Sequence, residues 1–198
     1  SSLAVALLVL AACGERPDPN LARAKAVLSA VPLIDGHNDL PERIRHDSIA
    51  RMDADKYDIA TKARGMTDIP RLRAGQVGAQ FWSVYVAGDS AAAGYAKMET
   101  EEIRIARRII EKYPDTFAWT LTAAEIRKAF AEHKIGSLLG FEGGHAIENS
   151  LDSLRSYYAQ GGRYMTLTHN VTTAWADAAL DSAIHGGLTK FGEEVIRE

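Results

Sequence analysis

The first residues that could do chemistry are a histidine and an aspartate near the start of the chain. His37 and Asp39 stand two residues apart, shortly after the apolar run 31–34. Residues two apart on an extended chain point to the same side, so both could meet one cation. An imidazole nitrogen and a carboxylate oxygen suit Zn²⁺ or a similar divalent ion. The alternative is a turn in which Asp35 and Asn38 bond their own backbone and His37 has no role.

Two further candidates, Glu142 and His169, each follow a segment that is predicted to be a strand. A carboxylate at such a position could bind a metal or move a proton. Glu142 could instead cap the helix that begins near Ser150, or pair with Arg155. A histidine such as His169, taken alone, could also be a hydrogen-bonded core residue.

Other polar and aromatic residues have structural interpretations. His145 is interpreted as a structural residue or as a support for the metal ligands. Asp177 is predicted to order the loop in which it lies. Trp82, Trp119 and Trp175 are candidates for the core or for the wall of a pocket, and nothing in the sequence separates these two roles.

The candidate residues follow elements that alternate between strand and helix. Strands are predicted at 31–34, 77–86, 117–121, 135–141 and 163–168, and helices at 21–30, 95–113, 150–160, from the capping box at 122–125 and from 188 onward. This alternation favours an α/β fold with parallel strands. Catalytic groups of a (β/α)8 barrel of the TIM type come from the carboxyl ends of its strands, and a complete barrel takes about 250 residues. The 198-residue chain is therefore expected to be about the first half of such a barrel.

A doubly wound sheet is the alternative architecture, and it also carries sites at strand ends. No G-x-G-x-x-G follows the first predicted strand, and the glycines at 140–144 accompany Glu142 and His145. This cluster therefore indicates metal chemistry better than a phosphate-binding loop.

Composition narrows the class of protein. The chain is 46% hydrophobic and 25% charged, as in ordinary globular proteins. The net charge of −3 gives no support for a nucleic-acid partner. Cys13 is the single cysteine, which excludes an intrachain disulfide.

The N-terminal segment resembles a bacterial lipoprotein signal. Residues 3–12 are apolar but too few to span a bilayer, and they fit the apolar region of a secretory signal. The sequence at 10–13, Leu-Ala-Ala-Cys, resembles a lipobox, in which the cysteine is lipidated. The alternative is a buried N-terminal helix with an incidental Cys13. We expect a signal segment at 1–13 that is clipped at the front, a tether and lead-in helix at 14–30, and a barrel segment at 31–198, with the protein lipid-anchored at a bacterial cell envelope.

Five ordered blocks of sequence carry a resemblance to a known family. They are LIDGHNDLP (33–41), RLRAG with GAQFWS (71–75 and 78–83), GFEGGH (140–145), RYMTLTHN (163–170) and WAD (175–177). In order and spacing they resemble the membrane dipeptidase family, also called renal dipeptidases, from about Val31 to the end.

The resemblance implies a zinc-dependent (β/α)8 barrel that hydrolyses dipeptides. It implies that His37 and Asp39 bind the first metal and that Glu142 bridges two Zn²⁺ ions. It also implies that His169 lies in the substrate pocket and polarises the scissile carbonyl or steadies its oxyanion, so Glu142 and His169 are the catalytic candidates. The family's second-metal histidines, its arginine for the substrate carboxylate and its proton-transfer aspartate lie beyond Glu198.

The hypothesis is a dipeptidase that uses a hydroxide held between two metal ions at about 3.5–4 Å separation. Its expected partners are a dipeptide substrate, a membrane reached through the lipid anchor, and a second copy in a homodimer. One alternative is a deacylase or lactonase on the same barrel. Another is a non-catalytic fragment or binding lipoprotein.

Overall fold

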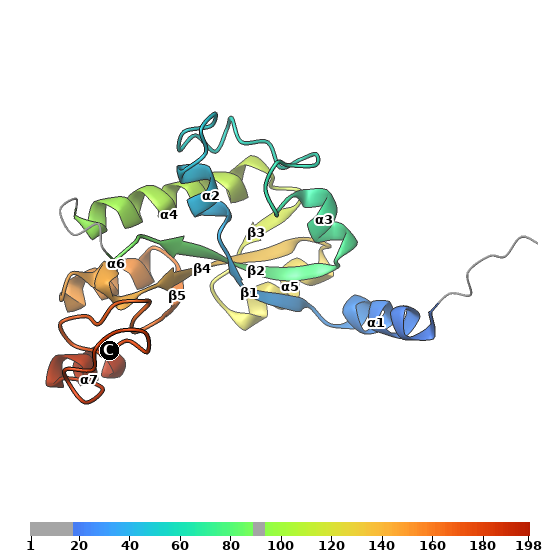
Figure 1. The fold of residues 1–198 in the computed structure, drawn as a ribbon. Helices are drawn as coiled ribbons and strands as arrows, with labels where there is room; N and C mark the ends of the chain where they lie inside the picture. Colours follow the sequence, from blue (N-terminus) through green and yellow to red (C-terminus); the bar gives the residue numbers. More distant parts are fainter. Residues whose placement is uncertain (1–17, 89–93) are drawn as a thin grey trace, which may run out of the picture.

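Parallel strands form the centre of the structure, a computed structural model that describes residues 18–88 and 94–198 (Figure 1). The elements in chain order are α1 (Pro19–Ala30), β1 (Leu33–Asn38), α2 (Leu40–Arg45), α3 (Ile69–Ala74), β2 (Val77–Tyr85), α4 (Tyr95–Lys112), β3 (Phe117–Trp119), α5 (Ala123–Ala131), β4 (Ile135–Glu142), the 3₁₀ helix η2 (Gly144–Ile147), α6 (Leu151–Ala159), β5 (Gly162–Met165) and α7 (Lys190–Arg197). The expected α/β class with parallel strands is confirmed.

The sheet has the order β1-β2-β4-β3, and every pairing is parallel. β5 also pairs with β4, at Phe141↔Met165, whereas β3 pairs with the opening residues of β4, at Phe117↔Ile135. At the carboxyl ends of the strands, the neighbours are therefore β1, β2, β4 and β5. This is the edge at which a parallel α/β fold places its functional groups.

Strand β4 is the most buried element of the sheet. All its residues are buried except Glu142 at its end, which is half-buried. Its register with β2 runs from Ala79↔Gly136 to Tyr85↔Glu142. The run 135–141 is almost entirely apolar or glycine, which predicts a strand covered on both faces. The structure confirms this prediction, and the burial holds Glu142 at a defined position.

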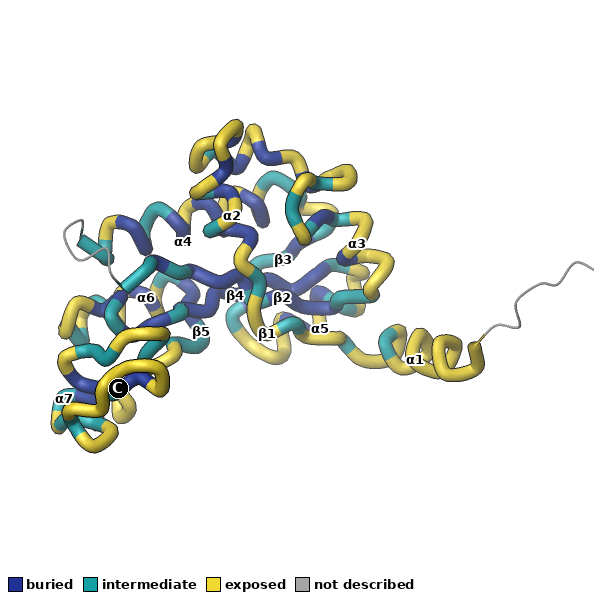
Figure 2. The backbone as a smooth tube through the Cα atoms, in the orientation of Figure 1, coloured by how far each residue is buried: buried dark blue, intermediate teal, exposed yellow. Residues whose placement is uncertain are grey.

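Strand β1 differs from its prediction. The apolar run 31–34, bounded by Pro and Gly, predicts the end of a buried strand. The strand instead continues to Asn38, and Leu33 and Ile34 are 40% and 46% exposed. The reason is that β1 pairs only with β2 among the described residues and lies at the edge of the sheet. Figure 2 shows β2 and β4 as buried, and β1 and α1 as mostly exposed.

The predicted helices begin within two residues of their predicted starts. Thr122 caps α5 by accepting a hydrogen bond from the Glu125 backbone N–H, and Ser150 caps α6 in the same way. On α6 the helical spacing from Leu151 and Leu154 predicts Tyr158 on the inner face. This prediction is wrong, because Tyr158 is 65% exposed and its neighbour Tyr157 packs into the core. Helices α2 and α3 were not predicted; each is six residues long and has a Pro as its second residue.

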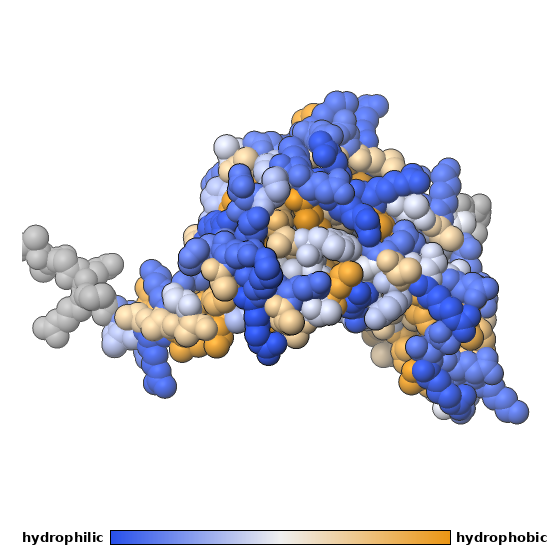
Figure 3. Space-filling model, turned by 180° about the vertical axis from the view of Figure 1, so that it is seen from behind, coloured by the Kyte–Doolittle hydropathy of each residue, from blue (hydrophilic) through white to orange (hydrophobic). Residues whose placement is uncertain are grey.

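The outer surface of the molecule is mixed. On the reverse face, hydrophilic side chains dominate the periphery, and apolar side chains gather near α1 and in the middle of the body (Figure 3). Across 18–88 and 94–198, none of the helices has both the length and the apolar character to cross a membrane. Cys13 lies outside the described residues, so its lipidation stays a prediction.

Candidate metal centre

Three side chains of ligand type meet at the carboxyl ends of β1 and β4. His37, Asp39 and Glu142 each offer one atom, and these atoms lie within 4.8 Å of one another. The Nε2 atom of His37 is 2.9 Å from Asp39 Oδ1 and 3.3 Å from Glu142 Oε2. The structure thus brings together residues more than one hundred positions apart in sequence, as the prediction requires, and their binding of a metal stays a prediction.

The end of β1 is held in place by the side chains on either side of His37. Asn38 Oδ1 accepts hydrogen bonds from the Leu40 N–H and the Thr67 hydroxyl, each at 3.1 Å. Asp35 Oδ1 accepts one from the His37 N–H at 3.1 Å. Asp35 and Asn38 therefore bond nearby backbone groups, as the alternative interpretation of a turn requires. His37 does not fit that alternative, because its ring faces the carboxylates of Asp39 and Glu142.

Glu142 is positioned by a turn that needs glycine. Gly143 has φ +106°, and its N–H donates to the Thr166 hydroxyl at 2.7 Å. A Cβ at this glycine would lie 2.3 Å from the His145 ring. The alternatives for Glu142 are not realised: Ser150 caps α6 with its own hydroxyl, and Arg155 pairs with Asp152 and Glu198.

His169 approaches the centre from the other side of Glu142. Its Nδ1 is 3.0 Å from Glu142 Oε1, so the two carboxylate oxygens face two different histidines. The ring of Tyr85 lies edge-on to His169 at a centroid distance of 5.0 Å. The structure therefore places His169 beside the predicted ligands, and its catalytic role stays a prediction.

Tyr164 belongs to the same centre, and sequence reasoning missed it. Its hydroxyl lies 2.9 Å from His37 Nδ1 and donates to the Gly36 carbonyl at 3.0 Å. Burial, assisted by the negative charge of Glu142 and Asp39, raises the pKa of Tyr164 to about 12, so the phenol keeps its proton. The only sequence signal is its place in a strand of the RYMTLTHN block, and that does not indicate a partner 127 residues earlier.

His145 and Asp177 have structural roles. His145 Nε2 lies 2.6 Å from the Val86 carbonyl, and burial lowers the pKa of this histidine. Asp177 accepts hydrogen bonds from the backbone N–H groups of Gly187, Ile184 and His185, which lower its pKa. The prediction that Asp177 orders its loop is confirmed.

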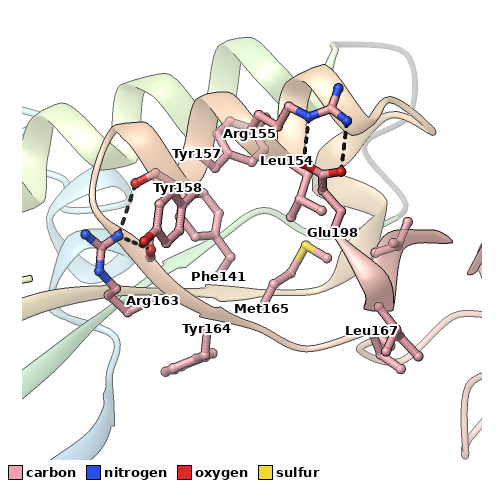
Figure 4. A pocket seen from close by; sticks show the side chains of 13 residues that line it. Phe141, Leu154, Arg155, Tyr157, Tyr158, Arg163, Tyr164, Met165, Leu167 and Glu198 are labelled. Carbon is pink, nitrogen blue, oxygen red and sulfur yellow. Dashed lines mark hydrogen bonds and ion pairs between the residues drawn. The ribbon is translucent and has the colours of Figure 1, made fainter. Parts of the chain in front are cut away.

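Two large hollows differ in their relation to the ligands. One of about 790 Å³ lies beside His37 and Asp39 and is also lined by Arg43, His46 and Arg64. Another, of about 720 Å³, lies between β5, α6 and α7 and is bordered by apolar and tyrosine side chains, by Arg163 and by the Arg155–Glu198 ion pair (Figure 4). The first hollow lies beside the predicted metal ligands His37 and Asp39, so we take it as the candidate substrate-binding pocket.

The donor set fits a divalent metal ion. One imidazole nitrogen and two carboxylate oxygens are the ligands that Zn²⁺ uses in catalytic sites, where three protein ligands leave a position for water or substrate. Partial exposure of the three side chains, between 19% and 56%, leaves access from solvent. Within residues 18–88 and 94–198 this is the only cluster of three or more such side chains.

Comparisons with known proteins give one family and several solved structures of similar fold. The family model described as "Membrane dipeptidase (Peptidase family M19)" matches residues 21–198. The crystal structure of the probable dipeptidase PvdM from Pseudomonas aeruginosa is similar, with a TM-score of 0.77, 14% identity, and coverage of 92% of this chain and 47% of that chain. A metallopeptidase from Rhodobacter sphaeroides, solved with a phosphinate mimic of the dipeptide L-Ala-D-Ala, has a TM-score of 0.69 and 21% identity, and the match covers 84% of this chain and 55% of that one.

A third solved structure, described as the metallopeptidase dipeptidase AC of family M19, has a TM-score of 0.70 and 22% identity, and the match covers 84% of this chain and 53% of that chain. The chain thus spans about half the length of the solved structures that it matches. At these identities the likeness shows the fold, and it agrees with a partial (β/α)8 barrel.

Proposed function

The chain belongs to the membrane dipeptidase family, peptidase family M19, and from this we propose that the protein containing it hydrolyses dipeptides with bound divalent metal ions. The observation that carries the proposal is the convergence of His37, Asp39 and Glu142 at one edge of the sheet. The dipeptide mimic in the Rhodobacter sphaeroides metallopeptidase supports the substrate class.

We propose that the metal is zinc and that two ions are held. His37 and Asp39 would hold one ion, and Glu142 would reach both, because its two oxygens face different sides of the centre. A pair of divalent ions would lower the pKa of a water molecule and polarise the peptide carbonyl. The remaining ligands of the second ion would come from outside this chain.

His169 is suited to stabilise the negative charge that develops on the substrate and to transfer a proton. With Nδ1 at 3.0 Å from a Glu142 oxygen, the ring is oriented by donating its Nδ1–H to that carboxylate. Nε2 is then the nitrogen left for substrate. As an imidazolium it would donate an Nε2–H to the oxyanion that develops on the attacked carbonyl, and after losing that proton it could accept one.

The test is zinc-dependent release of amino acids from Gly- or Ala-containing dipeptides by the whole protein. We expect a chelator to abolish hydrolysis and Zn²⁺ to restore it. Glu142→Gln should lower kcat/KM by at least about 100-fold, because a metal ligand should matter no less than the supporting residues whose loss costs 10–100-fold. Glu148→Gln is the matched control, since Glu148 is exposed and outside the cluster.

The same assay separates the alternatives. Faster turnover of N-acyl amino acids or lactones than of dipeptides would favour a deacylase or lactonase. Absence of both activity and tightly held metal in the whole protein would favour a non-catalytic binding lipoprotein and contradict the proposal.

We also propose that the protein is lipid-anchored through Cys13 at a bacterial cell envelope. The support is the apolar run 3–12 followed by Leu-Ala-Ala-Cys at 10–13. An active site in the barrel segment would then face dipeptides outside the cytoplasm.

A further inference from the structure

Tyr164 makes a contact across the whole width of the sheet at its functional edge. It lies on β5, yet its hydroxyl donates to the Gly36 carbonyl on β1 at 3.0 Å. In a flat sheet, three steps between neighbouring strands would separate β1 from β5 by about 14 Å, which is more than a tyrosine side chain and a hydrogen bond can span. The sheet must therefore curve, and Tyr164 lies on the concave side with its phenol beside His37.

The ring has room there because of a glycine. Gly140 on β4 is the register partner of Tyr164, and a Cβ at Gly140 would lie 2.1 Å from Tyr164 Cζ and 2.4 Å from its hydroxyl. Gly140 does not have a positive φ, so space explains its identity and backbone conformation does not. The Phe81 ring packs against Tyr164 at a centroid distance of 5.2 Å. Figure 4 shows Tyr164 on the opposite side of β5 from Met165.

The Tyr164 hydroxyl has one hydrogen, and the direction of this hydrogen determines whether His37 Nδ1 carries a proton. Because this hydrogen goes to the Gly36 carbonyl, the phenol oxygen can only accept from His37 Nδ1, at 2.9 Å. His37 therefore carries a proton on Nδ1, which leaves Nε2 as the ring nitrogen that can bind a cation. Nε2 faces carboxylate oxygens of Asp39 and Glu142 at 2.9 and 3.3 Å, so a metal ion bound there would be shared by all three side chains.

We propose that Tyr164 is a positioning residue that holds His37 in its Nδ1–H tautomer, with Nε2 free to bind metal. Gly140 provides the space that this role needs. The inference rests on the proposed function, because it assumes that His37 is a metal ligand. A hydrogen-bond partner on the second ring nitrogen orients ligating histidines generally, and its loss costs about 10- to 100-fold in metal affinity or activity.

The test is Tyr164→Phe in the whole protein, which removes the hydroxyl and keeps the ring. We expect zinc affinity, measured by competition with a chelator, to fall about 10- to 100-fold. In the ¹⁵N spectrum of the zinc-loaded protein, the Nδ1–H of His37 should exchange with solvent faster than in wild type. kcat should fall more than KM rises, since Tyr164 acts through His37. Tyr158→Phe is the matched control, because Tyr158 is 65% exposed and lies outside the centre.

A second variant keeps the inference testable if the first is unstable. Gly140→Ala should displace the Tyr164 ring and weaken zinc binding as Tyr164→Phe does. In a Tyr164→Ala background, Gly140→Ala should cost nothing further, because the ring with which the methyl group would clash is gone. If Gly140→Ala weakened zinc binding by the same factor in the wild-type and Tyr164→Ala backgrounds, the proposal would be contradicted.

The two proposals fail differently. If wild type neither binds zinc nor hydrolyses dipeptides, the proposed function is wrong. If wild type does both, and Tyr164→Phe retains wild-type zinc affinity and slow Nδ1–H exchange, only the role of Tyr164 is overturned.

Discussion

Two glutamates of α4 are buried where this helix packs near the carboxyl end of β2. Glu102 Oε2 accepts a hydrogen bond from the Tyr85 N–H at 2.9 Å, and its Oε1 is 3.7 Å from the Arg45 guanidinium. Burial raises the pKa of Glu102 to about 8, and Arg45 offsets only part of that effect. Burial and the neighbouring Glu102 raise the pKa of Glu99 well above its ordinary value. At neutral pH Glu102 is therefore mainly protonated, although its contact with Arg45 has the geometry of an ion pair.

A raised pKa makes stability depend on pH in a definite direction. The folded state holds a proton on Glu102 more tightly than the unfolded chain, where the ordinary pKa is 4.5. Its contribution to the free energy of unfolding is full below that value and is lost as pH rises toward about 8. The charged groups that act on it are Arg45, Glu42 and Asp39, and Glu99 is its buried neighbour.

We therefore expect the free energy of unfolding to fall between pH 5 and pH 8, and Glu102→Gln to reduce that fall. An amide cannot ionise, and its oxygen can still accept from the Tyr85 N–H. At about pH 8 the variant should be more stable than wild type by at least about 1.4 kcal/mol, the equivalent of one pKa unit. Urea denaturation over this pH range measures it, with the exposed Glu111→Gln on the same helix as control. Identical pH dependence in Glu102→Gln and wild type would contradict the assignment.

At the scale of elements, the centre depends on how β4 ends. The strand is buried until Glu142, and the chain then turns through Gly143 into η2. The next residue, Gly144, packs so closely that a Cβ would lie 2.4 Å from the Leu167 carbonyl and 2.5 Å from the Trp175 ring. The turn is thus packed against the segment that follows β5, and this packing fixes the position of Glu142.

We expect Gly143→Ala to damage both stability and metal binding. A φ of +106° strains any residue with a Cβ, and the added methyl group would collide with His145. The cost should be about 1–3 kcal/mol, measured by thermal or urea unfolding. Zinc affinity should fall with it, because relief of the strain moves Glu142.

Gly36→Ala is the matched control for this prediction. Gly36 adjoins His37, but its φ is not positive, and a Cβ there would meet nothing within 4 Å. Its stability should stay within about 0.5 kcal/mol of wild type. Equal losses in the two variants would show that the turn after β4 has no special role.

At the scale of the whole molecule, the described residues form a curved sheet, and its outer strands at the carboxyl-end edge, β1 and β5, have different surroundings. β1 is an edge strand with exposed Leu33 and Ile34, and β5 borders the hollow of about 720 Å³ between α6 and α7. Tyr164 links these strands by its hydrogen bond to Gly36. The chain spans about half the length of the solved structures it matches, so the barrel seen in this fold is a partial one.

The proposed anchor gives a prediction for the whole protein in a bacterial host. We expect wild type to sediment with the membrane fraction and to incorporate radiolabelled palmitate, and Cys13→Ser to be unlabelled and to leave that fraction. Glu142→Gln, which should change only the metal centre, should remain in the membrane fraction and so serves as control. Membrane association of Cys13→Ser equal to that of wild type would contradict lipidation at Cys13.

The sequence by itself determined the elements whose causes are local. The apolar segment 135–141 predicted β4, the capping residues Thr122 and Ser150 predicted the starts of two helices, and the blocks around His37 and Glu142 indicated the family. Burial periodicity and helix capping act within a few residues, so they can be read along the chain. The alternation of strands and helices was enough to predict the parallel α/β class. It was also enough to predict that polar groups meet at one edge of the sheet.

Only the tertiary structure decided which side chains meet and which are buried. Tyr164 lies 127 residues from His37, and their contact depends on the order and curvature of the strands. Leu33 became exposed because β1 lies at the sheet edge, and Glu102 became buried because α4 turns this carboxylate toward the backbone of β2. Contacts between distant segments follow from how elements pack, and no pattern within a single segment records that packing.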